Sequence, residues 1–235
     1  MWRLGSPTAL WAPLLLVRAR LGQAEGGDGA PQFNNSVCPA FWELQAPHMR
    51  ADFNIADLEG DYFELAFHDA TQYPLCPGQA KCITSDKRLS KHPDGVMFVN
   101  DTWGLSCFGV PYPQELLFNL TDSPGYLEGY VPVTRIPGLP KDVVSKVVFP
   151  NTIVDFKAGP QGWSLEMQCV QWMGHVVFVG INYYSKVNSE AAFQEMDRAA
   201  RARGLGLWLD HGFGLRRVSF TDCANASGTE AELAV

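Results

Sequence analysis

The sequence predicts an all-β domain, a sandwich or a barrel, with one helix near its C-terminal end. Three observations lead to this prediction. Twenty-two glycines and sixteen prolines are spread along the 235 residues and cut the apolar stretches short, which favours many short strands over long helices. About eight of the short apolar stretches are typical of strands. They all precede one segment that is rich in helix formers, and a last short strand follows that segment.

The expected strands alternate with turn residues. In chain order they are Tyr62–Phe67, the weaker Lys81–Leu89, Val96–Val99 after the turn 91–95, Glu115–Leu120, Tyr126–Val133 after the turn 122–125, a strand within Val143–Phe156 that is interrupted or begun at Pro150, and the hairpin Trp163–Trp172 and His175–Lys186 with its turn near Met173.

The helix is expected over Glu190–Arg203. Asn188 or Ser189 can cap its start, its acidic residues come early, its arginines come late, and Gly204 follows. Phe193, Met196 and Ala200 recur at i, i+3 and i+7, which predicts one apolar face packed against the strands. Arg217–Phe220 is the expected closing strand.

The N-terminus has the pattern of a signal peptide over residues 1–24. The apolar run Ala9–Val17 is followed by small residues at positions 22 and 24, as before a cleavage site. An uncleaved anchor and a plastid-type bipartite leader are the alternatives. We expect a flexible segment over 25–37, one domain over 38–223 and a disordered tail over 224–235. No stretch is long and apolar enough to predict a transmembrane segment.

Six cysteines follow this leader, which predicts three disulfides in an oxidising compartment. No Cys-x-x-Cys occurs and no histidine lies near a cysteine pair, so we expect no metal and no cofactor. Four tripeptides fit the N-glycosylation acceptor pattern, at Asn34, Asn100, Asn119 and Asn225. The net charge of −7 disfavours binding to nucleic acid, because an acidic surface repels phosphates.

Three short motifs resemble those of the lipocalins. Gly60-Asp61-Tyr62 resembles the family's Gly-x-Trp at the start of the first strand, with tyrosine in the tryptophan position. Val154-Asp155-Phe156 resembles its second motif, and Lys186 stands where a basic residue ends the last barrel strand. The resemblance covers about residues 38–223 and implies an eight-stranded antiparallel up-and-down lipocalin barrel with the C-terminal helix packed outside.

Two branches of the family share further features with the chain. The resemblance to apolipoprotein D-like lipocalins implies disulfides Cys38–Cys169 and Cys82–Cys223, which leaves Cys76 and Cys107 for a third bridge across the barrel mouth. Asn119 also lies where that branch often has a glycosylated asparagine. The lipocalin domain of violaxanthin de-epoxidase resembles the chain at 53–57 and in the helix. However, the cysteine-rich and glutamate-rich regions of that enzyme are not found here, and its catalytic carboxylate falls near Val147 or Val148.

The lipocalin resemblance implies a secreted or lumenal protein, with the plastid lumen as an alternative, that binds and carries a small hydrophobic ligand: a lipid, sterol, retinoid or carotenoid. The residues expected to contact it are aromatic: Tyr62, Phe67, Phe98, Trp103, Phe118, Tyr130, Phe156, Trp163 and Phe178. The sequence does not fix the oligomeric state.

Two other functions compete with ligand carriage. One is a de-epoxidase-like enzyme that reduces an epoxy-carotenoid in the barrel, for which Asp155 is the weak catalytic candidate. The other is an adhesion glycoprotein with a filled barrel. Asp61, Glu64 and Asp69 lie in one expected strand, but strict alternation keeps all three from entering one pocket. Catalysis is therefore the weaker hypothesis.

Overall fold

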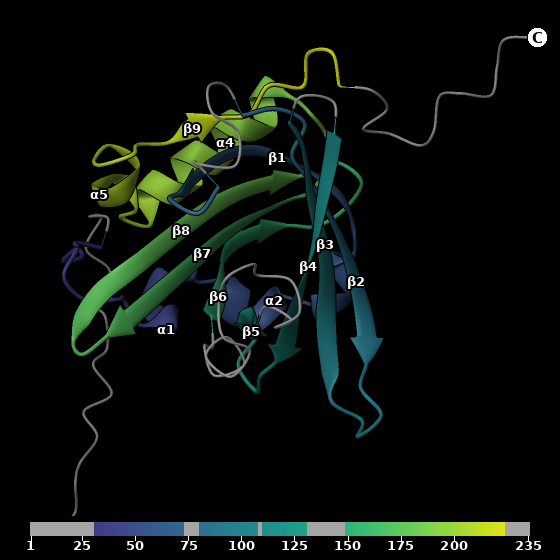
Figure 1. Cartoon of the computed structure of the whole chain (residues 1–235). Coiled ribbons are helices and arrows are strands. Elements are labelled where there is room, and N and C mark those ends of the chain that lie inside the picture. Colours follow the sequence, from purple (N-terminus) through teal and green to yellow (C-terminus); the bar gives the residue numbers. More distant parts are fainter. Residues whose placement is uncertain (1–30, 73–79, 108–109, 131–148, 224–235) are drawn as a thin grey trace, which may run out of the picture.

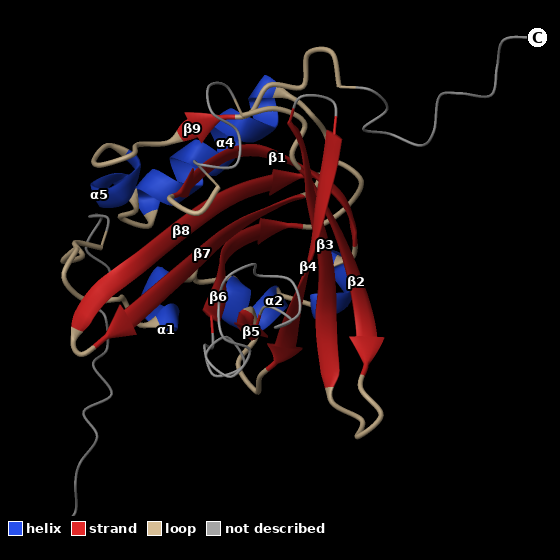
Figure 2. Ribbon diagram, viewed as in Figure 1, coloured by secondary structure: helices blue, strands red, loops and turns tan. Residues whose placement is uncertain are grey.

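A computed structural model describes residues 31–72, 80–107, 110–130 and 149–223. Within these residues, one antiparallel sheet runs in the order β2-β3-β4-β5-β6-β7-β8-β1-β9, and β1 also pairs with β2 (Figures 1 and 2). The additional pairing closes β1 to β8 into a barrel in which each strand pairs with the next. The structure therefore confirms the eight-stranded antiparallel up-and-down barrel.

The strands are β1 Gly60–Asp69, β2 Thr84–Lys91, β3 Met97–Cys107, β4 Val110–Leu120, β5 Tyr126–Tyr130, β6 Phe149–Lys157, β7 Trp163–Trp172, β8 His175–Ser185 and β9 Arg216–Arg217. The helices are α1 Phe41–Leu44, α2 Met49–Asp52, the 3₁₀ helix η1 Ile55–Leu58, α4 Glu190–Ala202 and α5 Gly206–Leu209. The closing strand, predicted over Arg217–Phe220, is only the two-residue β9 in the structure. Beyond it, Ser219 forms an isolated β-bridge with Lys81.

Two adjacent strands are much longer than the sequence predicts. β3 runs on to Cys107 and β4 begins at Val110, whereas the predicted strands cover only Val96–Val99 and Glu115–Leu120. The added part of β3 begins with Asn100-Asp101-Thr102 and the added part of β4 contains two prolines, so neither has the apolar alternation that marks a strand. Pairing between the two strands maintains both of them.

Helix α4 packs on the outside of the barrel, as predicted. The Ser189 hydroxyl caps it by accepting a hydrogen bond from the backbone N–H of Ala192 at 3.2 Å. Its apolar face, with Phe193 and Met196, is buried against β6, β7 and β8. Figure 1 shows the helix lying beside β8. No helix among the described residues is long and apolar enough to cross a membrane.

The N-terminal helices close one end of the barrel. Met49 of α2 and Leu58 of η1 pack with Phe118 and Ile153 in one buried apolar cluster. The Tyr62 hydroxyl donates to the Leu58 carbonyl at 2.9 Å.

Lys186 lies over the Tyr62 ring, with its ammonium 5.4 Å from the ring centre, and donates to the Asp57 carbonyl at 3.2 Å. Gly60 has a φ of +147°, a backbone conformation that residues with a β carbon rarely adopt, so glycine is favoured there. Tyr62 and Lys186, which stand in the tryptophan and basic-residue positions of the lipocalin motifs, therefore contact each other.

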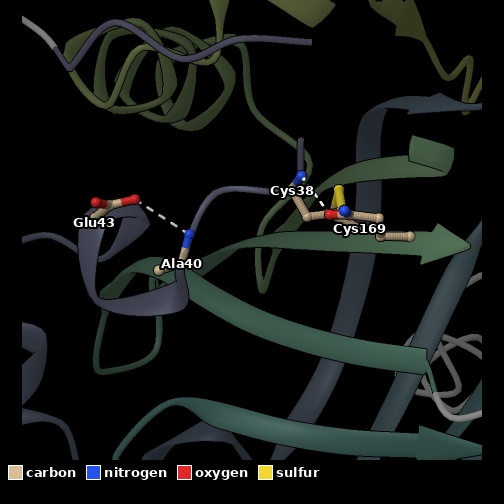
Figure 3. The surroundings of a disulfide bond; sticks show 5 residues. Cys38, Ala40, Glu43 and Cys169 are labelled. Atoms are coloured by element: carbon tan, nitrogen blue, oxygen red, sulfur yellow. Dashed lines mark hydrogen bonds between the residues drawn. A yellow bond between two sulfur atoms is a disulfide. The ribbon is translucent and has the colours of Figure 1, made fainter. Parts of the chain in front are cut away.

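Two disulfides attach the ends of the domain to the barrel, in the pairs that the resemblance implies. Cys38–Cys169 joins the segment before α1 to β7, and Cys82–Cys223 joins the start of β2 to the C-terminal segment. Figure 3 shows Cys38 beside Cys169, and Glu43 of α1 accepting a hydrogen bond from the backbone N–H of Ala40. The expected partner of Cys107, Cys76, lies outside the described residues.

We expect Met196→Ala to lower the free energy of unfolding by about 2–4 kcal/mol, because the Met196 side chain is fully buried between the helix and the barrel. Arg198→Ala is the matched control, since Arg198 is exposed on the same helix, and we expect it to change the free energy by less than about 0.5 kcal/mol. Chemical denaturation measures both. Equal costs for the two variants would contradict the packing described for α4.

Candidate ligand site inside the barrel

The centre of the barrel interior holds charged side chains. Lys87 of β2 contacts Glu166 of β7, and these two strands are not neighbours in the sheet, so the contact crosses the interior. Lys87, Asp101 and Glu166 are each no more than 2 % exposed. In the sequence these residues have no pattern that separates them from surface charges, so none of the three is predicted to be a site residue.

Lys87 forms the centre of a fully enclosed cluster, called here the Lys87 centre and composed of Lys87, Asp101, Glu166, Ser85, Asn151 and Ser164. The ammonium is 2.7 Å from Asp101 and 3.2 Å from Glu166. Ser85 donates to Asp101 at 2.6 Å, while Asn151 and Ser164 both donate to Glu166 at 2.8 Å. The cluster therefore supplies donors to each of its carboxylates.

Burial alone would lower the pKa of Lys87, but the nearby carboxylates of Asp101 and Glu166 outweigh burial and raise that pKa. The ring of Tyr184 adds a cation–π contact, with the Lys87 ammonium 4.3 Å from the ring centre. Lys87 thus stays charged across the physiological range and neutralises part of the acidity of the interior.

A second polar group, called here the Glu64 centre, consists of Glu64, Gln72, Trp103 and Asn182. Glu64 is fully buried. The Trp103 indole donates to one of its oxygens at 2.8 Å and the Gln72 amide donates to the other at 3.0 Å. With its amide nitrogen turned toward Glu64, Asn182 adds a third donor at 3.0 Å. All donors in this group are neutral.

Burial is the main cause that raises the pKa of Glu64 to about 8, although the hydrogen bonds from Trp103 and Gln72 act in the opposite direction. Nearby Asp69 raises the pKa further. Near neutral pH, the folded protein therefore holds Glu64 mainly as the neutral acid.

The acidic residues of the first strand do not all share one face, as expected, but a β-bulge decides which of them face inward. The register of β1 shifts between Glu64 and Ala66, which changes the face on which the later residues of the strand lie. Glu64 and Asp69 consequently share the interior, and Asp69 lies opposite Gly180 with its pKa raised by burial. Asp61 faces outward and pairs with the exposed Arg88.

Most of the aromatic residues predicted to contact a ligand do lie in the interior. Tyr62, Phe67, Trp103 and Phe118 are buried there. Two partly exposed rings lie on the same inner face near its two ends. Phe156 contacts Phe53, and Phe178 lies beside Gly180.

Two of the predicted contact residues lie outside the barrel. Phe98 is on the face of β3 opposite to buried Val99 and stacks on His92, with ring centres 4.1 Å apart. Trp163 belongs to the apolar cluster beneath α4. Near Phe98 and Trp163, both faces of the strand carry apolar residues. Alternation of apolar and polar residues therefore does not predict which of these two rings faces the interior. The side chain of Tyr130 lies outside the described residues.

Asp155 also lies on the outer face, which removes the residue that the enzyme hypothesis relied on. A register shift between Ile153 and Asp155 places it outside the barrel, where His48 is 3.1 Å from its carboxylate. Among the described residues, no group of three or more potential ligands could hold a metal ion. Of the expected glycosylation sites, Asn34 is exposed, Asn100 and Asn119 are partly exposed, and Asn225 lies outside the described residues.

The closed barrel, the helical turn that covers one end, the Tyr62–Lys186 contact and the external helix together define a lipocalin fold. No family model and no curated protein matches the sequence. Among solved structures, lobster apocrustacyanin A1 matches with a TM-score of 0.50 at 10% identity, over 83% of this chain and 93% of that chain. Apocrustacyanin C2 matches with a TM-score of 0.50 at 11% identity, over 80% and 91% of the two chains. At such low identity this likeness shows the fold alone.

We expect Lys87→Met to lower the free energy of unfolding by about 3–5 kcal/mol, because it leaves two carboxylates buried without a cation. Arg88→Met is the matched control. Arg88 is the next residue, is half exposed and pairs with Asp61 and Asp86 at 2.7 Å, so its loss costs less than about 1 kcal/mol. Urea denaturation measures both variants, and a Lys87 variant as stable as the Arg88 variant would contradict the Lys87 centre.

The raised pKa of Glu64 predicts a pH dependence of stability. Between pH 4.5 and about 8 the carboxyl is ionised in the unfolded chain and protonated in the folded one. A rise in pH across this window therefore favours unfolding by up to roughly 1.4 kcal/mol per pH unit.

We expect Glu64→Gln to remove this contribution, so that the variant gains stability relative to wild type from pH 4.5 to about 8. Asp61→Asn, an exposed change on the same strand, should follow wild type. Thermal unfolding at a series of pH values gives the comparison. Parallel curves for wild type and Glu64→Gln would show that Glu64 titrates normally.

Proposed function

We propose that the chain is a lipocalin that binds and carries a small hydrophobic ligand, such as a lipid, sterol, retinoid or carotenoid, in its barrel. The observation that carries this proposal is that apolar side chains surround the polar centres of the interior. Phe118, Leu127 and Ile153 lie toward the closed end, while Phe67 and Trp103 form a second apolar cluster with Tyr184 beside the polar groups. A hydrophobic chain or ring system would leave water for contact with these side chains.

The energy of such binding comes from apolar surface removed from water. Each Å² contributes roughly 25 cal/mol, so a ligand that buries about 300 Å² gains several kcal/mol before the costs of association. The lipocalin fold supports an interior site because a closed barrel of about eight strands is wide enough for one small ligand. Apocrustacyanins A1 and C2 share this fold, and their names describe ligand-free forms of a binding protein.

The proposal includes an extracellular location. The two disulfides, Cys38–Cys169 and Cys82–Cys223, are typical of oxidising compartments. They support secretion through the predicted signal peptide over residues 1–24 and glycosylation at the acceptor asparagines. Their pairing also supports an apolipoprotein D-like branch.

Titration with retinol, followed by its fluorescence and by quenching of tryptophan, tests the proposal. We expect saturable binding at about one site per chain. Phe178→Ser should weaken it about fivefold or more, because it removes an aromatic ring from the inner face of β8. Val177→Ser is the control, since Val177 is 60% exposed on the same strand, and it should bind like wild type.

Cholesterol, a carotenoid and a long-chain alcohol extend the titration to the other ligand classes. A folded, disulfide-bonded protein that shows saturable binding to none of these compounds would contradict the proposed function. Equal loss of retinol binding in the Phe178 and Val177 variants would place the ligand outside the barrel.

A further inference from the structure

We infer that the Glu64 centre recognises the head group of the ligand and that this head group is a protonated amine. The inference rests on the proposed function and makes it more specific, since it selects a hydrophobic amine from the broad class of apolar ligands. Two independent features of the described interior support it: a buried carboxyl group without a counterion, and a buried amide oxygen without a hydrogen-bond donor.

Glu64 has no basic partner in the part of the chain that the structure describes. No Lys, Arg or His in the described part of the chain forms an ion pair with it, and its hydrogen-bond donors are an indole and amides. The nearby Lys87 ammonium is already shared by Asp101 and Glu166. A buried carboxyl group ordinarily acquires a cation or loses its charge, and an ammonium from a ligand would complete this site.

The Glu64 centre also contains one buried acceptor without a donor. Gln72 is 8% exposed and donates its amide N–H to Glu64, but its buried side-chain oxygen has no hydrogen-bond partner among the described residues. The Glu64 carboxyl group lies next to this oxygen. An ammonium group presents three N–H donors and a positive charge, whereas a hydroxyl presents one donor. The unpartnered Gln72 oxygen therefore points to a donor-rich ligand.

The charged groups around Glu64 favour a cation over an anion. Asp69 on the same strand and Asp101 across the barrel both raise the pKa of Glu64 by repulsion, and Tyr184 on β8 faces it with a neutral hydroxyl. On β9, the partly exposed Arg216 lies opposite Phe67 and therefore on the same inner face, but it forms no ion pair with Glu64. A fatty-acid carboxylate at this centre would meet like charges and would find few free donors.

Binding of an amine would displace the proton of Glu64. At neutral pH the free protein holds the acid form, since its pKa is raised to about 8. An incoming ammonium stabilises the carboxylate, so the proton leaves to the buffer while the ligand keeps its own three N–H groups. An amine complex thus differs from an alcohol complex in released protons as well as in affinity.

Isothermal titration calorimetry with decylamine, decanol and decanoate, which share one chain length, tests the inference at pH 7 in two buffers of different ionisation enthalpy. We expect decylamine to bind about tenfold or more tighter than the other two ligands. We also expect its binding to release close to one proton per chain. Decanol should bind without proton release.

Glu64→Gln keeps the size of the side chain and should weaken decylamine about tenfold or more, remove the proton release and leave decanol within about threefold of wild type. Asp61→Asn, an outward-facing change on the same strand, should match wild type for all three ligands. A cooperative thermal transition for each variant confirms that it is folded.

The outcomes separate this inference from the proposed function. In one outcome, decanol and retinol bind while decylamine binds no tighter than decanol, or binds equally well to Glu64→Gln. In that case the proposed hydrophobic site stands and the inference of an amine head group is wrong. Preferred binding of decanoate would also overturn the inference. If none of these compounds binds, the proposed function and the inference both fail.

Discussion

The buried Lys87 ion-pair cluster is the interaction on which the rest of the barrel interior depends. It joins β2, β3 and β7 across the centre of the barrel, through Lys87, Asp101 and Glu166. Removing three charges from water is costly, and the cluster meets that cost through short ion pairs and hydrogen bonds from Ser85, Asn151 and Ser164. Because these partners come from several strands, the cluster fixes which side chains face inward. The apolar closed end and the Glu64 centre take their positions around it.

The two polar centres differ in whether the protein supplies a cation. The Lys87 centre brings its own cation to its carboxylates, which is what a structural element requires. The Glu64 centre has a carboxyl group with no cation among the described residues, although each centre holds one buried amide oxygen without a partner, in Gln72 and in Asn151. Burial at both centres is nearly complete, so burial does not explain the difference. A group from outside the chain would explain it, and this contrast links the fold to ligand recognition.

The sequence predicts the architecture well because strand alternation, turn residues and the capped helix are local signals. It also predicts Tyr62 and Lys186, which correspond to the lipocalin motifs. It fails where a single residue changes the register. The bulge at Leu65 turns Asp69 into the barrel, and the shift at Val154 turns Asp155 out of it. Trp163 fails for another reason, since the wall beneath α4 is as apolar as the interior.

The central claim is that a hydrophobic ligand occupies the barrel with its polar end at Glu64. A crystal structure of the protein with a bound long-chain amine tests this claim most directly. The account predicts that the chain lies among the inner aromatic residues Phe67, Trp103 and Phe178, with the amine nitrogen within hydrogen-bond distance of Glu64 and Gln72. A barrel filled entirely by its own side chains, with the amine bound only to the outer surface, would contradict it.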